Sequence, residues 1–224
     1  MRFDIITIFP NIFDPYFNES IIKRAREKKL VEICAHNLRD FTEDKHKKVD
    51  DSPYGGGAGM VLMAEPILQA VDRIRKSPPP SLSSSTRGKV GEGVKKTKIV
   101  ILSAKGKQFN QKLAYEWSKK YDRIIMISGR YEGIDERVKI ALKAEEISLG
   151  PYVLTDGDAG VMVLVSAVSR LIPGVIKLDS LEEESHWNLL LKKNVLPNKG
   201  LEYPHYTRPE VLAYKGKKYR VPKI

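Results

Sequence analysis

Residues 128 to 160, SGRYEGIDERVKIALKAEEISLGPYVLTDGDAG, carry the pattern that decides the fold. They follow an apolar run, Arg123 to Ser128, which is typical of a buried parallel strand and ends at a glycine. Ile134 to Leu142 then has the apolar spacing of a helix, and Glu145 to Leu149 indicates a second short strand that also ends at a glycine. Two glycine-rich loops therefore leave adjacent strand ends, and such loops form the usual ligand crevice of an open α/β sheet.

The same alternation of strands and helices extends over the rest of the chain. Further strands are predicted at Arg2 to Phe9, Val31 to Leu38 and Lys98 to Ser103, the last followed by an exit loop at Ala104 to Gly106. Further helices are predicted at Tyr16 to Lys29, Ala64 to Arg75, Asn110 to Lys120 and Asp158 to Ile172. Asp156 or Asp158 is expected to cap the last helix. This order predicts an α/β fold with a parallel sheet flanked by helices.

Three segments depart from this pattern. Arg39 to Asp51 is dense in both charges and predicts an exposed loop. Ser77 to Lys98 is rich in Pro, Ser and Gly and then in Lys, so it has too little apolar surface to offset its ordering entropy and is predicted to be a flexible basic insertion. After Pro209 the chain is expected to fade into a basic tail that ends at Ile224. We predict one main domain over residues 1–175, followed by a linker region over residues 176–224.

Composition limits the classes of function. Lys and Arg number 39 against 28 Asp and Glu, and the net charge of +11 favours a polyanionic partner such as nucleic acid. Cys34 is the single cysteine, which excludes a disulfide framework and a cysteine-based metal site. The longest apolar run, Val161 to Val165, is too short to span a bilayer. The N-terminus opens directly into a strand without a signal peptide, so a cytoplasmic protein is expected.

A glycine-rich loop, Ser52 to Met60, has two interpretations. It lacks the GK[ST] of a P-loop and the spacing of a dinucleotide fingerprint, so neither of those phosphate-binding mechanisms applies. It is either a flexible turn before the next helix or a bare backbone surface that lets a planar ligand approach closely.

Seven segments, taken together and in order, resemble bacterial TrmD-type tRNA (guanine-N1)-methyltransferases of the SPOUT superfamily. They are IFPNIFD (8–14), RDFT (39–42), VDDSPYGGGAGM (49–60), SGRYEGIDERV (128–138), SLGPYVL (148–154), SRLIPGV (169–175) and YPHYTRPEVL (203–212). The resemblance implies a SPOUT-type fold with a C-terminal trefoil knot and a homodimer whose active site lies between subunits. It also implies methyl transfer from S-adenosylmethionine to N1 of guanosine 37 in tRNA, and a divalent ion, Mg²⁺.

The resemblance also assigns roles to individual residues. Binding of the methyl donor falls on Leu102, Ser103, Ala104, Gly129, Tyr131, Leu149, Gly150, Pro151, Tyr152, Val153, Leu154 and Gly157. Binding of the RNA substrate falls on Asp50, Gly57, Gly59 and Arg130. Glu132 is expected near the methionine end of the donor and the target guanine. Arg170 is expected to hydrogen-bond guanine O6 and stabilise the charge that develops there.

The general base is assigned from chemistry and from position in the sequence. N1 of guanine must lose a proton to be methylated, so a carboxylate within hydrogen-bond reach is required. The family uses Asp followed by Ser, and the best match here is Glu184 followed by Ser185, with Glu182 and Glu183 leaving the register open. Plain alternatives remain: a solvated acidic helix at Glu184, a solvated loop carboxylate at Glu132, and a helix-dipole partner at Arg170.

The chain also departs from the family pattern. Asp156-Gly157-Asp158 stands where the family has two glycines and Glu, which adds a carboxylate near the cofactor loop. The family continues beyond Pro222 into a helical tRNA-binding domain that this sequence lacks, so weaker tRNA binding is expected. A non-catalytic RNA-binding protein on the same fold is therefore the competing hypothesis.

Overall fold

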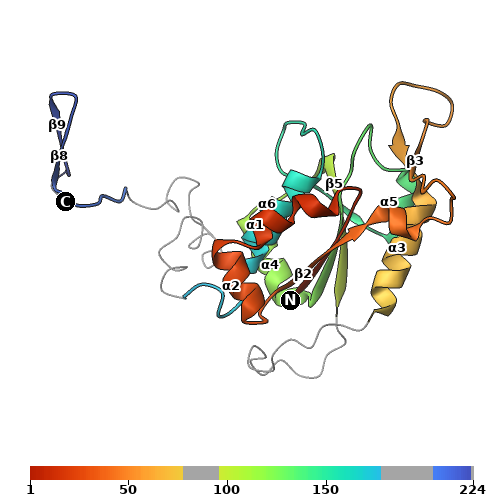
Figure 1. Cartoon of the computed structure of the whole chain (residues 1–224), viewed down its shortest axis with the longest axis horizontal. Helices are drawn as coiled ribbons and strands as arrows, with labels where there is room; N and C mark the ends of the chain where they lie inside the picture. The colour runs from red at the N-terminus through yellow and green to blue at the C-terminus, as the bar shows by residue number, and fades with distance from the viewer. Residues whose placement is uncertain (78–95, 178–203, 223–224) are drawn as a thin grey trace. The chain divides into compact units, whose positions relative to one another are not determined.

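A sheet of parallel strands forms the centre of the protein. The computed structural model describes residues 1–77, 96–177 and 204–222, and the chain divides into two compact units, Met1–Leu178 and Asp179–Ile224. The first unit contains a five-stranded sheet in the order β2-β1-β6-β5-β7, and every pairing in it is parallel (Figure 1). Its strands are β1 (Arg2–Thr7), β2 (Glu32–Asn37), β5 (Thr97–Gln108), β6 (Arg123–Ile127) and β7 (Glu145–Ser148). The predicted parallel α/β architecture is confirmed.

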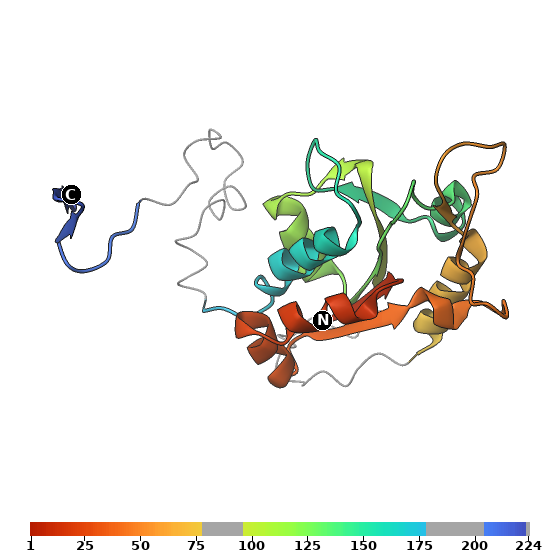
Figure 2. The same cartoon turned by 45° about the horizontal axis from the view of Figure 1, so that its top comes forward.

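Helices cover both faces of this sheet. One side carries α3 (Ala64–Lys76) and α5 (Glu136–Leu142), and the other carries α1 (Asp14–Phe17), α2 (Ser20–Glu27), α4 (Gln111–Lys120) and α6 (Asp158–Ser169) (Figures 1 and 2). Short 3-10 helices are η1 (Pro10–Ile12) and η2 (Leu38–Phe41). A small antiparallel pair, β3 (Asp50–Asp51) and β4 (Val61–Leu62), brackets the glycine-rich loop.

The core follows from the alternation of side chains along the strands. Ile125 and Ile127 of β6 pack in one apolar cluster with residues of α3, and the equally buried Ile124 and Met126 alternate with them and point to the opposite face. Helix α6 contacts both α4 and β1 and is apolar on nearly every side, so most of it is buried. Each large aliphatic side chain buried in this way contributes about 1.5 to 3 kcal/mol.

The predicted helix from Tyr16 to Lys29 is two helices in the structure, so that prediction was wrong. Helix α1 ends where the Asn18 amide bonds the Asp14 carbonyl, and Ser20 has a left-handed φ of 52° at the start of α2. Phe17 and Ile22 are nonetheless both buried. Apolar spacing therefore predicted which side chains face the core but not the break between the helices.

Two loop predictions also need correction. The predicted exposed loop begins with η2, whose Phe41 is buried beneath the guanidinium of Arg73, 5.3 Å from the ring centroid. Thr97 and Lys98, at the end of the predicted insertion, belong to β5, and residues 78–95 lie outside the described part of the chain.

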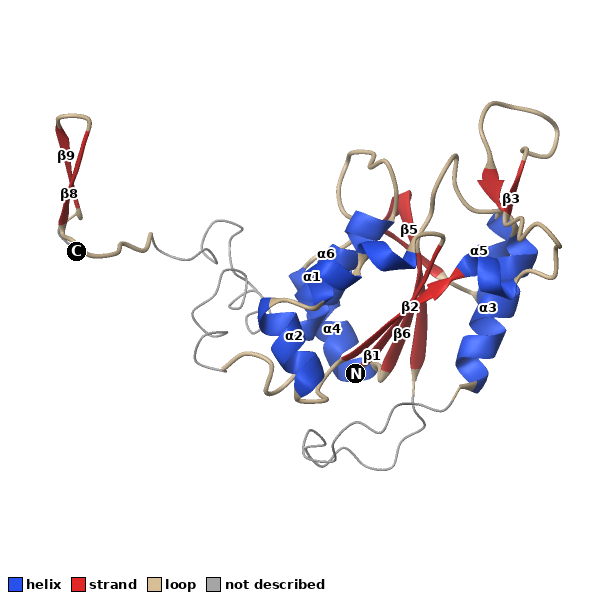
Figure 3. Cartoon of the chain, in the orientation of Figure 1, coloured by secondary structure: helices blue, strands red, loops and turns tan. Residues whose placement is uncertain are grey.

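The predicted basic tail is a β-hairpin, so that prediction was wrong as well. In the second unit β8 (Val211–Tyr214) pairs antiparallel with β9 (Lys217–Arg220) (Figure 3). Lys215 and Gly216 connect the strands with φ values of 49° and 75°. Two consecutive left-handed residues make a type I′ turn, which matches the twist of a two-residue hairpin. The dipeptide Lys-Gly was the local signal for this turn.

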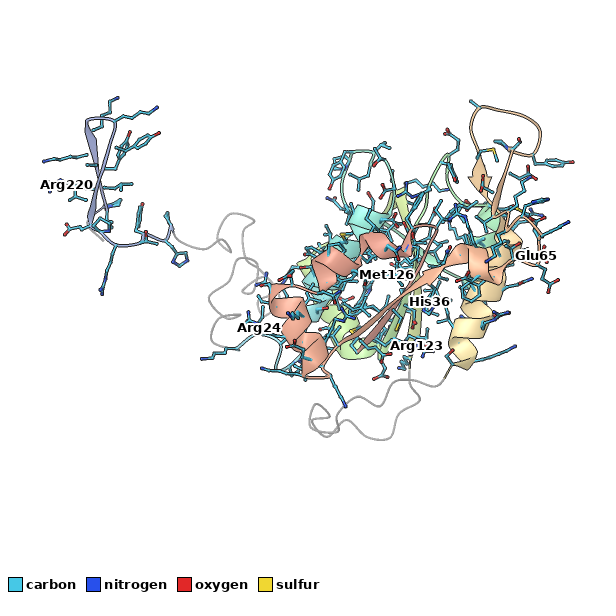
Figure 4. The ribbon with its side chains drawn as sticks, viewed as in Figure 1. Arg24, His36, Glu65, Arg123, Met126 and Arg220 are labelled. Atoms are coloured by element: carbon cyan, nitrogen blue, oxygen red, sulfur yellow. The ribbon has the colours of Figure 1, made fainter. Side chains whose placement is uncertain are left out.

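A buried carboxylate links three strands to α3. Asp4 on β1 is fully buried and accepts hydrogen bonds from Arg2 Nη2 at 2.8 Å and His36 Nε2 at 2.8 Å. Arg123 Nε on β6 lies 3.4 Å from Asp4 Oδ2, and Arg123 Nη1 donates to the Ile74 carbonyl in the last turn of α3 at 2.9 Å (Figure 4). Burial opposes ionisation of Asp4, but the hydrogen bonds from His36 and Arg2 outweigh it and hold the pKa of this carboxyl below its ordinary value.

Replacing this carboxylate should destabilise the protein. Asp4→Asn leaves the guanidinium groups of Arg2 and Arg123 without their buried counter-charge, and we expect the free energy of unfolding to fall by about 3 to 5 kcal/mol at pH 7. Urea denaturation followed by circular dichroism measures the loss. Asp72→Asn, on the exposed side of α3, is the matched control and should change stability by less than about 0.5 kcal/mol.

The same pair of proteins tests the pKa of Asp4. Because this pKa is lowered in the folded state, its contribution to stability is fully present above the unfolded-state pKa of about 3.9 and is lost as the pH falls through the folded-state value. The difference in stability between wild type and Asp4→Asn should therefore be constant above pH ~5 and shrink below pH ~4. A difference that is unchanged down to pH ~2 would contradict this assignment.

Candidate active site

A cavity of about 430 Å³ opens at the carboxyl ends of β6 and β7 and beside the middle of β5. Its wall consists of residues 101–105 from β5, 129–136 after β6, and 146–149 and 152–157 from β7 and the loop that follows, together with Lys139 and Gly160. The crevice expected between the two glycine-rich loops is therefore present. Ligand sites of open parallel sheets lie at this edge because the strand-end loops diverge there.

An irregularity in β5 shapes one wall. Leu102 and Lys107 both pair with Ile147, so the intervening residues bulge out of the ladder and bring Ser103, Ala104 and Lys105 to the cavity. The predicted end of the strand at Ser103 was wrong, because β5 resumes after the bulge. At Gly106 a Cβ would lie 2.5 Å from the backbone of Glu146 and Ile147, so β5 can return to the ladder only through glycine.

The second wall is the loop from Gly129 to Gly133. Tyr131 has a left-handed φ of 58°, and its side chain is half exposed. The Glu132 amide donates to the Met60 carbonyl at 3.0 Å, and a Cβ at Gly59 would lie 2.5 Å from Glu132 Oε1. The structure therefore brings the glycine-rich loop of residues 52–60 into contact with Glu132 at the rim of the cavity.

Two other residues predicted to bind RNA lie farther along that loop. Asp50 forms part of β3, and Gly57 has a left-handed φ of 132° and packs only loosely against Pro53. Neither Asp50 nor Gly57 lines the cavity. Tyr54, at the tip of the same loop, is fully exposed, and it was not singled out from the sequence.

The third wall is the loop after β7. The Gly157 amide donates to the Gly129 carbonyl at 2.8 Å, and a Cβ at Gly157 would lie 2.8 Å from the Gly129 amide nitrogen and 3.2 Å from Leu102 Cβ. This loop therefore crosses the ends of β5 and β6 in direct backbone contact. Ten of the twelve residues predicted to bind the methyl donor line the cavity, whereas Gly150 and Pro151 lie in the same loop but do not.

Two carboxylates organise the N-terminus of α6. Asp156 Oδ1 accepts from the Asp158 amide at 2.9 Å, which confirms the predicted cap. Asp158 is fully buried and accepts from Thr7 Oγ1 at 2.9 Å and from Arg130 Nη2 at 2.8 Å. The Arg130 guanidinium also lies 4.3 Å from the ring centroid of Phe9. Sequence reasoning missed this link, because Thr7 and Asp158 are far apart in the chain and Asp158 was considered only as a helix cap and as a departure from a family motif.

A network of ion pairs forms the outer rim. Lys105 Nζ lies 2.9 Å from Glu136 and 3.5 Å from Glu146, and Lys139 Nζ lies 3.2 Å from Glu136. The hydrogen bond with Glu136 raises the pKa of Lys105, and the same bond lowers the pKa of Glu136. This part of the rim is thus charged but nearly balanced, in contrast to the apolar side chains of Tyr152, Val153 and Leu154 in the loop after β7.

The predicted catalytic residues are not all brought together within one chain. Glu132 lines the cavity. Arg170 follows the last turn of α6, whereas the cavity lies at the first turn, and a helix of 12 residues is about 18 Å long. Glu184 lies outside the described residues.

The described part of the chain contains neither a metal-binding cluster nor a membrane-spanning helix. Among residues 1–77, 96–177 and 204–222, His, Cys, Asp and Glu side chains do not gather in any group of three that is arranged to hold a metal ion. In the same residues we find no helix with the length and apolar character needed to cross a membrane.

Comparison with known proteins agrees with the resemblance seen in the motifs. The family model described as tRNA (Guanine-1)-methyltransferase TrmD matches residues 1–224. A protein of Thermomicrobium roseum is 46% identical over 96% of this chain and 71% of its own length, and one of Dictyoglomus turgidum is 48% identical over 93% and 74%. A protein of Clostridioides difficile is 44% identical over 93% of this chain and 80% of its own length. Each relative is named tRNA (guanine-N(1)-)-methyltransferase, and the chain belongs to the TrmD family.

Proposed function

We propose that this protein transfers a methyl group from S-adenosylmethionine to N1 of guanosine 37 in tRNA. The observation that carries the proposal is the coincidence of one cavity with the strand-end loops that match the family motifs. Membership of the family supports tRNA guanine-N1 as the acceptor, and the excess of basic residues suits a polyanionic substrate. The reaction is assigned to the cytoplasm, where tRNA is modified.

The cavity suits the methyl donor in size and in the character of its wall. Its volume of about 430 Å³ lies within the usual range for small-molecule sites. Exposed apolar side chains at Tyr152, Val153 and Leu154 offer a surface for the adenine ring, and the backbone around Gly129 and Gly157 offers unobstructed polar groups. Glu132 supplies a negative charge at the rim, which favours a donor whose sulfonium is positive.

The chemistry requires a base and a partner for the guanine oxygen. Glu184 takes the N1 proton, the N1 electron pair forms the bond to the methyl carbon, and the carbon–sulfur bond breaks to leave S-adenosylhomocysteine. Arg170 donates to guanine O6, where negative charge accumulates as N1 is deprotonated. These roles rest on the family resemblance and on the chemical requirement for a carboxylate.

The distance between the ends of α6 supports a site shared by two subunits. Because Arg170 and the cavity lie at opposite ends of the helix, Arg170 of the partner subunit would complete the site in a homodimer. A trefoil knot is proposed at the loop after β7, and the backbone crossing at Gly157 is consistent with such a close passage. Mg²⁺ is proposed as a requirement of the reaction, held by substrate or by residues outside the described part of the chain.

Methyl transfer to transcripts tests this function directly. Labelled S-adenosylmethionine is incubated with unmodified tRNA transcripts that carry G or A at position 37, with Mg²⁺ present or chelated. Methylation of the G transcript alone, lost on chelation, is the expected result. If no methyl group is transferred but calorimetry still detects binding of S-adenosylhomocysteine, the competing hypothesis of a non-catalytic RNA-binding protein is favoured.

Removal of the proposed base should separate catalysis from binding. We expect Glu184→Gln to lower kcat by about 10² to 10⁴-fold, because the amide cannot accept the N1 proton. The affinity for S-adenosylhomocysteine, measured by calorimetry, should stay within about twofold because the donor does not need the base.

The neighbouring glutamates supply matched controls for this experiment. Glu182→Gln and Glu183→Gln remove the same charge two residues and one residue before Glu184, respectively, and should keep kcat within about threefold. Loss of turnover in one of them, with Glu184→Gln active, would move the base to that position and refute Glu184.

A single methyl group at Gly157 should disturb the donor site. The Cβ of Gly157→Ala would overlap the Gly129 amide nitrogen, so the loop must shift, at a cost of about 1 to 3 kcal/mol in stability. We expect the Kd for S-adenosylhomocysteine to rise at least about tenfold, because the shifted loop forms one wall of the cavity.

Ala159→Ser is the control for this substitution. It adds one atom at an exposed position in the first turn of α6, two residues after Gly157, and it should leave the stability and the Kd for S-adenosylhomocysteine nearly unchanged. Normal donor affinity in Gly157→Ala would show that the cavity is not the donor site.

A further inference from the structure

The hairpin of β8 and β9 is an exposed surface that the enzymatic site does not explain. Every residue from Leu212 to Arg220 is exposed within the described structure. A lone two-stranded hairpin is only marginally stable in water, since neither of its faces is covered. Such a segment gains most from a partner that covers at least one face.

The register divides the hairpin side chains into two faces. Leu212 is opposite Tyr219 and Tyr214 is opposite Lys217, so these four share one face, which we call the aromatic face. Lys218 and Arg220 lie on the other face with the small residues Val211 and Ala213, and we call this the basic face. Figure 4 shows side chains projecting from both sides of the hairpin, Arg220 among them.

The charge of this unit points to a polyanion. Its described residues, 204–222, contain Arg208, Lys215, Lys217, Lys218 and Arg220 against the single carboxylate Glu210. Ion pairs with Glu210 cannot neutralise five cations, so a positive field remains around the strands. RNA phosphates are the complementary partner, and their counterions are released when lysines replace them.

The aromatic side chains narrow the partner to unpaired nucleotides. Tyr214 and Tyr219 are 58% and 53% exposed, and the Lys215 ammonium lies 5.4 Å from the Tyr214 ring centroid. Exposed rings interleaved with cations are how sequence-tolerant binders hold single strands, since every base has a face on which a ring can stack. Paired bases in an RNA helix do not offer these faces, whereas loops do.

Composition argues against a protein partner on this surface. Lysine is depleted in protein–protein interfaces, and lysines on an exposed strand also discourage edge-to-edge pairing with a second copy. We propose that the β8–β9 hairpin binds unpaired nucleotides of the tRNA substrate, with the lysines on phosphates and the two tyrosines on bases. The identification of the RNA as tRNA rests on the proposed function. The recognition of phosphates by lysines and of bases by tyrosines does not depend on it.

Neutralising the three hairpin lysines tests the proposed contacts between lysines and RNA phosphates. The variant Lys215→Gln/Lys217→Gln/Lys218→Gln should bind an unmodified tRNA transcript about tenfold or more weakly in fluorescence anisotropy at 0.1 M salt. The slope of log K against log[salt] should become shallower by about 2, since each lost contact to a single strand removes about 0.7. Affinity for S-adenosylhomocysteine should stay at the wild-type value, which shows that the first unit is intact.

Lysines elsewhere provide the control for net charge. Lys112→Gln/Lys119→Gln/Lys120→Gln removes the same three charges from the exposed side of α4. It should change tRNA affinity by less than about twofold, because charges beyond a Debye length from the RNA are screened. An equal loss in this control would show that only overall charge matters and would overturn the proposal.

Removing the rings of Tyr214 and Tyr219 tests the proposed stacking of tyrosines on unpaired bases. Tyr214→Leu/Tyr219→Leu keeps the face apolar and should weaken binding to the transcript about tenfold without changing the salt slope. Binding to a blunt RNA duplex should be unchanged by this variant, because a duplex offers no free base faces. Equal loss on both RNAs, or no loss on either, would overturn the stacking assignment.

Further readouts separate this proposal from its rivals. If the hairpin covers another protein surface, the tyrosine variant should dissociate oligomers in sedimentation equilibrium while tRNA affinity stays unchanged, and that result would refute RNA binding. The binding measurements need no methyl transfer. Hairpin-dependent tRNA binding without methylation would therefore overturn the proposed activity and leave this inference standing.

Discussion

The backbone crossing at Gly157 is the constraint on which the rest of the site depends. The loop after β7 passes so close to the ends of β5 and β6 that its amide bonds Gly129 and that no side chain fits at this position. That passage closes one wall of the cavity and fixes where α6 begins. Asp156 and Asp158 then secure the helix start, the first by capping it and the second by bonding Thr7 and Arg130.

The closest contacts between the segments of the cavity wall are made at glycines, and charged side chains line the cavity beside them. Glycines or left-handed residues stand wherever two segments meet, at Gly59 against Glu132, at Gly106 against Glu146 and at Gly157 against Gly129. A wall of this kind suits tight binding of a flat, extended ligand, because it needs no reorganisation when the ligand enters.

The two compact units divide the work in different ways. The first unit has a close-packed core and a buried charge network around Asp4, which is suited to holding a cavity rigidly. The described residues of the second unit are almost all exposed, basic and aromatic, which suits a surface that orders against a partner. Under the proposed assignments, substitutions in the hairpin and in the cavity would alter affinity for RNA and affinity for the methyl donor independently.

The sequence by itself determined the parallel α/β architecture, a helix cap at one of two residues, Asp156 or Asp158, and the two loops that bound the cavity. These features depend on local periodicity and on turn residues, which act over a few positions and can be read directly from the chain. The motifs also indicated the family, because seven short segments in a fixed order are specific when each one alone is not.

Only the tertiary structure decided which distant residues meet. The contact of Glu132 with Gly59, the bond between Thr7 and Asp158, and the ion pairs around Lys105 join residues from separate elements, and no local pattern encodes such pairings. The sequence also did not predict the bulge in β5 or the break between α1 and α2, because packing overrode the periodicity at both places. The hairpin was missed because its turn is short and its apolar pattern is weak.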